Sequence, residues 1–344
     1  MASKSRSPWL IKDSGIPAEE IRSARLEYLV RYAVLAPSTH NTQPWLFRVR
    51  GDALELVADR SRALPIADPS GRELTISCGA ALQFARMAAR NLKLEASVEL
   101  LPDANDPELL ARLRLGGARA SPTAREIRRF KAIPKRHTNR TALAPRPELD
   151  RVIADLGPLA RRYGVNFRAS AAEEVRTRIA TLVATADQRQ MADPAFRHEL
   201  SSWVRPAKSR ARDGMSISSF GMRDWLSAGV AMALDQLDLS CATTDRHHKL
   251  ILEAPWVGIL ATPRDDPPSW LRTGMALADI LLEITAAGLA YSFANQPIEA
   301  SEFRSPIAKV MGSDDHPQML MRIGAGQEVP AAARRAAEQV TLTE

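Results

Sequence analysis

The feature that most constrains the fold of this chain is a pair of long apolar segments, one in each half of the sequence. The first is "RELTISCGAALQFARMAARNLKLEA" and the second is "SWLRTGMALADILLEITAAGLAYS". When the two are aligned, Gly79 lies on Gly274 and Leu94 lies on Leu289. Each segment has the length and apolar character of a buried helix, and each is followed by a strand-like run. The chain is therefore predicted to be internally doubled, so that one polypeptide resembles a fused dimer.

The segments around these two helices mix helical and strand-like patterns, which favours an α+β fold with a mixed or antiparallel sheet flanked by helices. Residues 21–35 carry apolar positions at helical spacing, and residues 45–58 form a β-hairpin pattern that turns at Gly51-Asp52. Further strands are predicted in "SVELLP", "LARLRL", "PWVGILATP", "AYSFANQPI" and "PQMLMRIGA", and a further helix in "EFRSPIAKVMG". We assign residues 1–124 to the first half and residues 125–344 to the second.

Residues 188–246, between the two halves, do not follow a regular pattern. This stretch mixes Gly, Pro and Ser with the large aromatic residues Trp203, Phe220 and Trp225. Long irregular segments in folded proteins are most often covers over a site or disordered inserts. The apolar anchors argue against disorder, so this segment is predicted to be a lid inserted into the second half.

The charge balance suits a small anionic ligand better than a nucleic acid. The formal net charge is +7 and the pI is about 9.7. Basic residues concentrate in Arg125–Arg140 and Arg205–Arg212, but aromatic residues make up 5 % of the chain and do not alternate with them. A surface that stacks single-stranded bases needs such aromatic residues. Nucleic acid is therefore not expected as a partner.

Other classes of protein are disfavoured by simple counts. No apolar run reaches the roughly 20 residues of a membrane helix, and no secretory signal is evident, so we expect a cytoplasmic protein that does not bind membranes. The two cysteines, Cys78 and Cys241, lie in apolar surroundings and favour buried thiols in a reducing compartment. His247-His248 lacks further ligands at metal spacing, so no metal site is predicted.

A short polar stretch, "LAPSTHNTQPWLFRV" at residues 35–49, interrupts the pattern between the first helix and the hairpin. Ser38, Asn41 and Gln43 place hydrogen-bonding groups within a few positions, and Pro37 and Pro44 restrict the backbone around them. We call residues 37–44 the cradle. It can be a simple connection between a helix and a strand, or a rigid polar surface that holds a ligand.

Three other stretches share this polar character. "KRHTNR" at residues 135–140 carries several cations, "ANQPIEA" at residues 294–300 follows a strand, and "AAARRAAE" holds Arg334 and Arg335. An arginine guanidinium is a planar fork that matches phosphate or paired carbonyl oxygens. Each stretch alone is consistent with a solvated basic or polar turn.

Together these four stretches resemble the nitroreductase-like FMN flavoprotein superfamily, and most closely its internally fused Acg-type members. "APSTHNTQPW" matches the Pro-Ser-x-x-Asn-x-Gln-Pro-Trp signature of that superfamily, and "KRHTNR" is similar to its Arg-x-Ser/Thr motif. "QPIEA" looks like the Pro-Ile-Glu loop and "ARRAAE" like the terminal basic pair that binds phosphate. The resemblance covers residues 20–340 and implies a nitroreductase-like fold.

The order of the motifs differs from ordinary members, where the Arg-x-Ser motif comes first in a short chain and two chains share two flavin sites. Here the cradle precedes the arginine motif by about a hundred residues, and each motif occurs in one half alone. The cradle of the first half and the arginine motif of the second half therefore make one complementary set of flavin-binding motifs. The resemblance therefore implies a single FMN held between the halves of each chain, which would be a monomer or would pair again as a homodimer.

The resemblance also implies a role for each matching residue, while no residue is expected to act as a catalytic acid or base because the flavin carries the chemistry. Glu299 would direct its backbone N–H at flavin N5, and Gln43 would either contact the ligand or fix the turn with Trp45. The role of His40 stays open. From the cradle, the implied cofactor-binding residues are Pro37, Ser38, Asn41 and Gln43. Arg136, Thr138 and Arg140 of the arginine motif would bond the pyrimidine edge and ribityl chain, with His137 contributing through its backbone. Pro297, Ile298 and Glu299 of the loop would lie against the ring, and Arg334 and Arg335 would hold the phosphate.

Two functions follow from this resemblance. As an FMN-dependent oxidoreductase, the protein would pass a hydride from NAD(P)H to a nitroaromatic or quinone-like acceptor. As a flavin store, which has been suggested for Acg-type members, it would hold FMN under the lid and react poorly with nicotinamides. Specialised flavin chemistry, such as azoline oxidation or flavin destruction, is a third alternative. The sequence has no glycine-rich dinucleotide fingerprint, so NAD(P)H would bind as a passing substrate.

Overall fold

The computed structural model describes residues 7–11, 22–206, 209–216 and 240–342, which form two similar α+β halves. The first half contains α1 (Arg22–Ala33), the 3-10 turns η2 (Thr39–Asn41) and η3 (Arg60–Arg62), β1 (Trp45–Arg50), β2 (Ala53–Ala58), α2 (Arg72–Asn91), β3 (Leu94–Leu100) and β4 (Leu109–Ala118). The expected hairpin at residues 45–58, with its turn at Gly51-Asp52, is therefore confirmed.

The second half is larger. It contains α3 (Ala124–Ala132), η4 (Ile133–Lys135), α4 (Leu149–Arg161), β5 (Asn166–Ser170), α5 (Glu173–Ala192), α6 (Pro194–Ser202), β6 (Val204–Arg205), β7 (Met215–Ser216), α8 (Ser240–Leu252), β8 (Trp256–Thr262), α9 (Pro267–Ala286), β9 (Ala290–Phe293), α10 (Gln296–Glu299), α11 (Ser301–Val310), β10 (His316–Gly324), α12 (Ala337–Val340) and β11 (Thr341–Leu342).

The two main sheets have the same strand order. The first runs β11-β1-β2-β4-β3 and the second runs β5-β8-β10-β9. Leaving β11 aside, β1, β2, β4 and β3 correspond to β5, β8, β10 and β9, and every neighbouring pair in both sets is antiparallel. The aligned helices α2 and α9 each have 20 residues, and the alignment places their first and last residues together. The α+β class and the internal duplication predicted from the sequence are confirmed.

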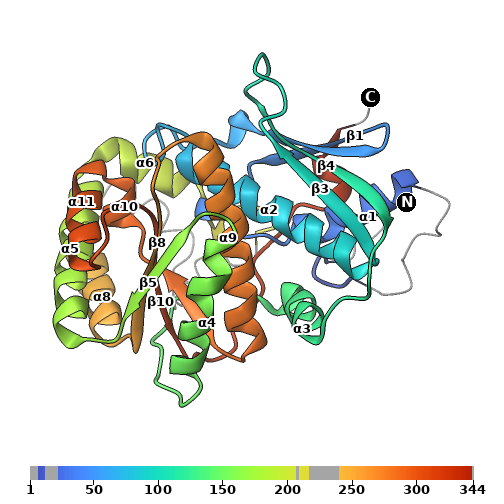
Figure 1. Cartoon of the computed structure of the whole chain (residues 1–344). Helices are drawn as coiled ribbons and strands as arrows, with labels where there is room; N and C mark the ends of the chain where they lie inside the picture. The colour runs from blue at the N-terminus through green and yellow to red at the C-terminus, as the bar shows by residue number, and fades with distance from the viewer. Residues whose placement is uncertain (1–6, 12–21, 207–208, 217–239, 343–344) are drawn as a thin grey trace.

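Helices α2 and α9 lie side by side through the centre of the molecule and join the halves (Figure 1). They meet at the two aligned glycines. A Cβ atom on Gly79 would lie 3.1 Å from Gly274 Cα and would overlap Leu271 O, and a Cβ on Gly274 would lie 2.8 Å from Gly79 Cα. No larger residue fits at either position without moving a backbone, so the small residues set how closely the halves approach.

Each half buries its sheet against these central helices. The first core contains α1, α2 and the inner face of the first sheet, while alternate residues of β3 remain exposed on the outer face. The second sheet is covered on both faces, by α4 and α9 on one side and by α5, α8 and α11 on the other. Residues of β8 alternate between the two cores, with Leu260 in one and Ile259 in the other.

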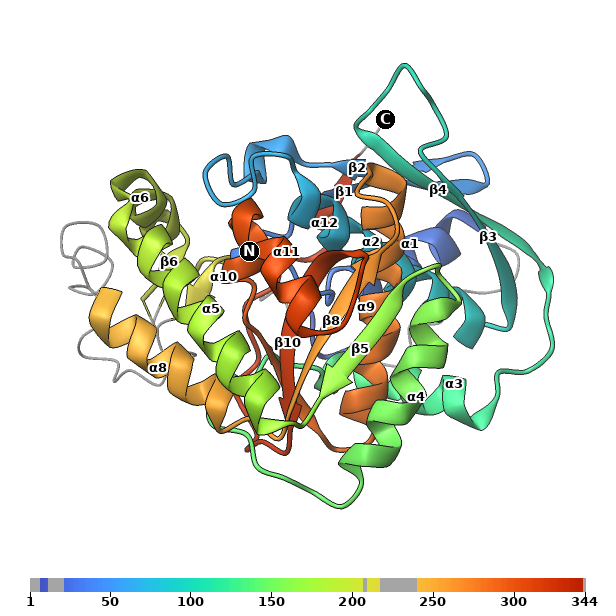
Figure 2. The ribbon, with the colours of Figure 1, turned by 60° about the vertical axis from the view of Figure 1, so that its left-hand side comes forward.

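The largest difference between the halves lies between corresponding strands. In the first half, β1 and β2 are joined by the turn at Gly51-Asp52, whereas in the second half α5, α6 and α8 lie between β5 and β8. These helices gather on the flank of the molecule away from the first sheet (Figures 1 and 2). The predicted cover, residues 188–246, is the central part of this insertion, and its role as a lid stays a prediction. Phe220 and Trp225 lie outside the described residues.

Strand β11 returns from the second half to the first sheet. It pairs in parallel with β1, where Thr341 lies opposite Phe47 and Leu342 opposite Arg48. Val340, just before it, is buried in the core of the first half. The end of the chain therefore belongs structurally to the half where the chain began.

One strand expected from the sequence is wrong at its C-terminal end. "AYSFANQPI" reads as continuous strand, but β9 ends at Phe293 and Gln296–Glu299 form the single turn α10. Pro297 at the start of that turn has no N–H to donate to a ladder, and its fixed φ suits the first turn of a helix. Residues 294–299 therefore leave the sheet and turn back toward the cradle side of the molecule.

Two simpler expectations concern exposure. Cys78 is buried with its Sγ 3.2 Å from Pro44 O, and burial raises the pKa of its thiol, so it is an unreactive core residue. The side chain of Cys241 lies outside the described residues. Among the helices that the structure describes, none is both long and apolar enough to cross a membrane.

The central crossing generates a stability prediction. We expect Gly79→Ala to destabilise the protein by about 1–3 kcal/mol or more, because the added methyl group forces two packed helices apart. The control is Gly157→Ala in α4, where the nearest heavy atom to an added Cβ is Arg161 Nη1 at 3.4 Å. Because alanine favours a helix over glycine, Gly157→Ala should be neutral or stabilising. Urea unfolding of both variants checks this, and equal stabilities would contradict the role given to the crossing.

Candidate functional site

The cradle has an unusual backbone. His40, Asn41 and Gln43 adopt φ values of 51°, 57° and 53°, a left-handed region that residues other than glycine rarely occupy. Ser38 supports this conformation, because its carbonyl accepts from Asn41 N at 3.0 Å and its Oγ accepts from Gln43 N at 2.9 Å. Such conformations cost energy, and they cluster at sites where the surrounding structure fixes them for a purpose.

The side chains of Asn41 and Gln43 tie the cradle to two distant segments. Asn41 Nδ2 donates to Gly214 O at 2.9 Å and to Ala333 O at 3.0 Å. Gln43 Nε2 donates to Arg212 O at 2.8 Å, and Gln43 Oε1 accepts from Arg335 N at 2.8 Å. Both amides are therefore satisfied by the insertion and by the C-terminal segment, and Gln43 acts as a clamp between them.

Arg136 and Arg334 bring two buried guanidinium groups to the cradle. Arg136 Nη2 donates to Leu35 O at 3.0 Å, and its Nη1 donates to the Tyr291 hydroxyl. Arg334 Nη1 donates to Asn41 Oδ1 at 2.7 Å. Burial, together with the charge of Arg136, lowers the pKa of Arg334 to about 9. The two groups come from opposite ends of the second half and face the same polar turn of the first.

These two arginines lack the partners that buried cations normally require. Arg136 is 1 % exposed and Arg334 is 5 % exposed, and the Nε atom of each is buried without a hydrogen-bond acceptor. Among residues 7–11, 22–206, 209–216 and 240–342, neither forms an ion pair with a carboxylate. Buried charges are otherwise paired, because desolvating them costs several kcal/mol. The arrangement fits a ligand anion such as a phosphate.

The N-terminal segment covers this pair of arginines, which the sequence did not indicate. Trp9 Nε1 donates to Ala332 O at 2.7 Å, and the Arg334 guanidinium lies 4.9 Å from the centre of the Trp9 ring. The His137 ring packs edge-on against Trp9 at 4.6 Å. Burial and the charge of Arg136 lower the pKa of His137 to about 4, so this imidazole is neutral at pH 7.

Arg140 lies in a second group of cations beside the first. Arg246 of α8 donates from Nη2 to Arg140 O at 3.0 Å, and Arg322 of β10 donates to Thr141 O at 2.8 Å and to Asn139 O at 3.4 Å. Burial and the charge of Arg246 lower the pKa of Arg140 to about 10. His40 lies near the same cations. Burial and the charge of Arg140 lower the pKa of His40 to about 4.

Arg335 differs from Arg334, although the two are adjacent. Arg335 Nη1 lies 3.3 Å from Asp59 Oδ2 and 3.2 Å from Gln43 O, so a carboxylate already neutralises it. Its side chain fastens the C-terminal segment to the first half. Of the two arginines expected to bind phosphate, Arg334 is the one that is buried near Arg136. The role of Arg335 as a phosphate ligand stays a prediction.

The turn that carries residues 297–299 is linked to the cradle through Asn295, whose Nδ2 donates to Glu73 Oε1 at 3.2 Å. Pro297 and Ile298 are buried, and Glu299 Oε2 accepts from Gln190 Nε2 at 2.7 Å. Glu73 Oε2 accepts from the cradle residue Thr39 at 2.6 Å. Burial and the charge of Glu73 raise the pKa of Glu299 to about 8.

Hydrogen bonds and ion pairs hold the insertion against the cradle side of the first half. Glu199 accepts from the backbone N–H groups of Ile66 and Ala67, at 3.0 and 2.8 Å. Asp213 pairs with Arg62 at 2.9 Å and with Arg205 at 3.1 Å. Together with the bonds from the cradle to Arg212 and Gly214, these contacts hold Glu199 and residues 212–214 against the first half.

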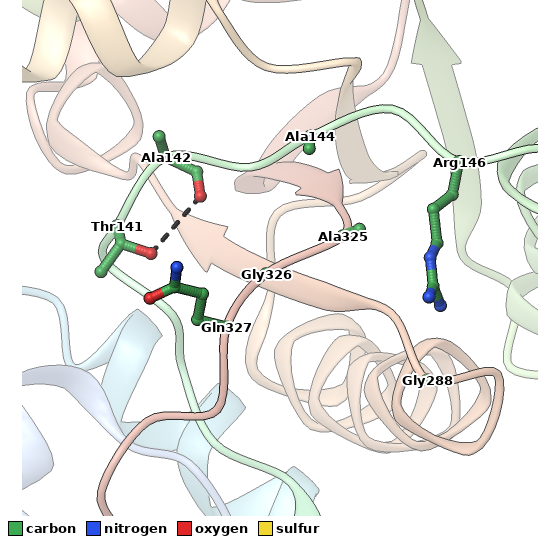
Figure 3. Close-up of a pocket in the computed structure, with 8 residues that line it drawn as sticks. All are labelled: Thr141, Ala142, Ala144, Arg146, Gly288, Ala325, Gly326 and Gln327. Atoms are coloured by element: carbon green, nitrogen blue, oxygen red, sulfur yellow. Dashed lines mark hydrogen bonds between the residues drawn. The ribbon is translucent and has the colours of Figure 1, made fainter.

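Two open hollows lie outside this arrangement. One, of about 460 Å³, lies beyond the arginine motif, where Arg146 and Gln327 reach in beside Gly288 and Thr141 (Figure 3). The other, of about 520 Å³, separates Ile66 from α6 and Trp203. Neither is lined by a residue of the cradle or by Arg136 or Arg334. We do not assign the predicted ligand to either.

The structure thus brings the four predicted stretches together. Arg334 bonds directly to Asn41, and Arg136 bonds to Leu35, two residues before the cradle, while Thr138 is partly buried. Sequence reasoning missed Trp9, Tyr291, Arg246 and Glu73. Tyr291 looks like an ordinary strand residue, and nothing local marks Arg246 among the many arginines of the insertion.

Comparison with known proteins places the chain in a family. No family model matches it. A protein of Mycobacterium tuberculosis (strain H37Rv), which carries the provisional name NAD(P)H nitroreductase, is 32 % identical over 336 residues, covering 94 % of this chain and 91 % of the relative. The chain belongs to the NAD(P)H nitroreductase family. A second protein from that strain, provisionally named NAD(P)H nitroreductase acg, is 29 % identical over 333 residues and covers 95 % and 97 %. The resemblance to Acg-type nitroreductases is confirmed.

Solved nitroreductases are more distant. A protein of Anabaena variabilis described provisionally as a nitroreductase has a TM-score of 0.49 and 10 % identity, covering 93 % of this chain and 91 % of that one. The FMN-dependent nitroreductase NfnB of Mycobacterium smegmatis, solved with NADPH, has a TM-score of 0.42 and 18 % identity, covering 63 % and 99 %.

The carboxyl group of Glu299 generates a pH prediction. In the folded protein it keeps its proton up to about pH 8, whereas in the unfolded chain it ionises near 4.5. The folded state binds more protons in this window, so this group makes the free energy of unfolding fall as the pH rises from about 5 to about 8. Glu299→Gln cannot ionise, so this variant should lose less stability over that range than the unmodified protein.

Thermal unfolding at pH 5.5 and pH 8.5 measures the effect. The control is Glu302→Gln, an exposed neighbour that pairs with Arg189 and should leave the pH dependence unchanged. A Glu299→Gln variant with the same fall in melting temperature as the unmodified protein would contradict the assignment.

Proposed function

We propose that this nitroreductase binds one FMN per chain and transfers a hydride from NAD(P)H to a nitroaromatic or quinone-like acceptor. The observation that carries this proposal is the pair of buried arginines beside the cradle, Arg136 and Arg334, which have no carboxylate partner among the residues that the structure describes. Each lies in a motif that resembles a flavin-binding motif of the superfamily. A phosphate monoester there would supply the acceptors that both Nε atoms lack.

The other matching residues give the pocket its polarity. Arg140 and Thr138 would face the pyrimidine edge and ribityl chain, and Pro37, Ser38 and Asn41 would line the opposite side. Pro297, Ile298 and the Glu299 backbone would lie against the ring. These placements follow the motifs, whereas the resemblance alone would put Arg136 at the pyrimidine edge rather than at the phosphate. The bond between Arg334 and Asn41 supports a site shared by the cradle and the C-terminal segment.

Charge is what these residues contribute to the chemistry. Hydride exchange is the reaction that bound FMN supplies, while the protein orients the group and tunes it. An arginine about 4 Å from a developing negative charge contributes on the order of 4 kcal/mol at an effective dielectric constant near 20. Desolvation of the guanidinium cancels part of this. If about half remains, a two-electron couple shifts upward by roughly 40 mV, since 30 mV corresponds to about 1.4 kcal/mol.

Flavin storage is the second candidate function, and the contacts between the insertion and the first half favour it. Arg212 and Gly214 of the insertion accept hydrogen bonds from the cradle residues Gln43 and Asn41, and Glu199 and Asp213 add further contacts to the first half. A ligand held beneath such a cover exchanges slowly and offers little room for a nicotinamide. An enzyme that alternates between two substrates needs an accessible stacking face instead.

Mixing the purified yellow protein with NADPH and then NADH under anaerobic conditions separates the two functions. If the protein is an oxidoreductase, we expect rapid loss of the flavin absorbance with at least one donor, because the hydride transfer needs no oxygen. Persistent colour with both donors would support storage. A purified protein without flavin that also fails to bind added FMN would overturn both.

The arginine pair generates a binding prediction. We expect Arg136→Ala to weaken FMN binding at least about tenfold, because a charge-assisted contact contributes about 1.5–3 kcal/mol. Titration of the flavin-free protein with FMN, followed by flavin fluorescence, measures the change. The control is Arg146→Ala, which removes an exposed arginine from the same connecting segment and should leave the affinity unchanged.

Because Arg136 also bonds to Leu35 O and Tyr291, loss of folding must be separated from loss of binding. Tyr291→Phe removes one of these bonds while it keeps the cation, so this variant should retain most of the FMN affinity. A folded Arg136→Ala protein with full flavin content would contradict the proposed site.

A further inference from the structure

Helix α8 of the insertion carries a histidine that meets the turn implied to lie against the flavin ring. His247 Nδ1 lies 3.2 Å from Asp187 Oδ2 of α5, and Gln296 Nε2 of α10 lies 3.2 Å from the same nitrogen. Gln296 also donates to Asp187 Oδ1 at 3.4 Å. Helices α5 and α8 lie side by side (Figure 2). His247 and Asp187 belong to none of the four stretches that resemble flavin-binding motifs.

The buried carboxylate fixes which way the imidazole faces. Asp187 is 5 % exposed and also accepts from Thr244 Oγ1 at 3.2 Å. Because a carboxylate accepts hydrogen bonds and does not donate them, the proton of the neutral imidazole belongs on Nδ1. The other ring nitrogen, Nε2, forms no hydrogen bond with the residues that the structure describes. A histidine held in this way can take and release a proton at Nε2, while the carboxylate stabilises the charged form.

The surroundings of the imidazole suit a group that exchanges protons with a ligand. The side chain of His247 is 30 % exposed, so water can return a proton to it. Gln296 Oε1, on the amide that contacts the imidazole, is buried and has no hydrogen-bond donor among the described residues. This oxygen is available to a hydroxyl group of a ligand, such as the hydroquinone that a quinone becomes on reduction.

Helix α8 also contacts two segments that would border the flavin ring. Arg246 Nη2 donates to Arg140 O at 3.0 Å, and Arg140 would face the pyrimidine edge. The next residue, His247, contacts Gln296 at the start of the turn that ends at Glu299, whose backbone N–H would face N5. Consecutive residues of α8 therefore reach two borders of the proposed pocket, and the imidazole lies on the border where the hydride would leave.

Reduction of the proposed acceptors needs a proton as well as a hydride. When a quinone takes up a hydride with its electron pair, one oxygen is left negative, and a proton must be added to give the neutral hydroquinone. One hydride and one proton likewise convert a nitroaromatic compound into a nitroso compound and water. A positioned acid typically speeds such a proton transfer by about 10²–10⁴-fold.

We infer that His247, oriented by Asp187, gives a proton from Nε2 to the oxygen of the quinone or nitro acceptor. In this step the Nε2–H bond breaks, an O–H bond forms on the acceptor, and the imidazolium becomes a neutral imidazole that water reprotonates. The inference rests on the proposed function, in which bound FMN supplies the hydride. Asp187 is a positioning residue here, because it acts through the imidazole.

Other titratable groups near the imidazole must be separated from it in a pH measurement. Asp187 contacts it from α5, and Arg246 and His248 flank it on α8. Glu299 lies on the same α10 turn as Gln296. Burial and the charge of Glu73 raise the pKa of Glu299 to about 8, so this carboxyl group changes charge within the range of the test.

The test reduces the bound flavin with one equivalent of dithionite under anaerobic conditions and then mixes the protein with menadione, a quinone. The return of the flavin absorbance measures the transfer. His247→Asn should slow it at least about tenfold, because asparagine can keep the hydrogen bond to Asp187 but has no acidic proton to give. Ferricyanide is the reference acceptor, because it takes one electron and no proton, so its rate should not change. His248→Asn on the same helix should leave both rates unchanged.

The pH dependence gives a second comparison. From about pH 6 to about pH 9, the rate with menadione relative to ferricyanide should fall in the unmodified protein, because an imidazole loses its proton as the pH rises. His247→Asn should abolish this fall. Glu299→Gln should keep it, because the proton comes from the imidazole and not from that carboxyl group.

A third measurement does not depend on turnover. In the oxidised protein with isotope-labelled histidine, NMR reports which ring nitrogen carries the proton, and the His247→Asn variant identifies the signal. We expect the proton of the neutral ring on Nδ1, and Asp187→Asn should weaken that preference.

Four results would overturn the inference: an unchanged rate with menadione in a folded His247→Asn variant, equal slowing with menadione and ferricyanide, loss of the pH dependence in Glu299→Gln, or a neutral ring protonated on Nε2. Equal slowing would mean a structural role, and the Glu299→Gln result would assign the proton to that residue. If NADPH and NADH fail to reduce the flavin but menadione gives the expected pattern, the role of His247 stands and the nicotinamide part of the proposed function fails.

Discussion

The contact between Gly79 and Gly274 is the constraint on which the rest of this structure depends. Without side chains at these positions, α2 and α9 approach until each backbone touches the other, and the two halves become one packed unit. The first turn of α2 carries Glu73, which binds the cradle, and α9 leads into the strand that carries Tyr291, the partner of Arg136. The distance between the halves at the site is therefore set at the centre of the molecule, by residues that take no part in binding.

The site itself is built on unbalanced charge. Two of the buried arginines in the described residues have carboxylate partners, Arg129 with Asp279 and Arg72 with Glu73. Arg136 and Arg334 do not, and their nearest polar contacts within the described residues are backbone oxygens, the Tyr291 hydroxyl and the Asn41 amide. Neutral acceptors can orient a guanidinium but cannot cancel its charge. This separates a site prepared for an anion from the structural ion pairs around it.

The sequence predicted the repeated helices and the four polar stretches well, because both depend on local residue patterns. Apolar continuity predicts α2 and α9, and their aligned glycines indicate a shared packing requirement. The sequence could not distinguish Arg334 from Arg335, because the direction of each side chain depends on how the segment packs in the fold. In the structure, Asp59 pairs with Arg335. Trp9 and Arg246 were missed for a related reason. Each reaches the site from a distant element, and no local pattern records where that element will lie.

The return of β11 to the first sheet has a consequence for synthesis. Because Thr341 pairs with Phe47, the outer edge of β1 stays open during synthesis until the ribosome has made residues 341 and 342. Uncovered strand edges invite pairing with other molecules, and contacts between distant residues form late in folding. Arg334 lies just before that strand in the sequence, so the anion site cannot be completed until this segment has reached the first half. Closure of the sheet and competence to take up a ligand thus become a single late event in folding.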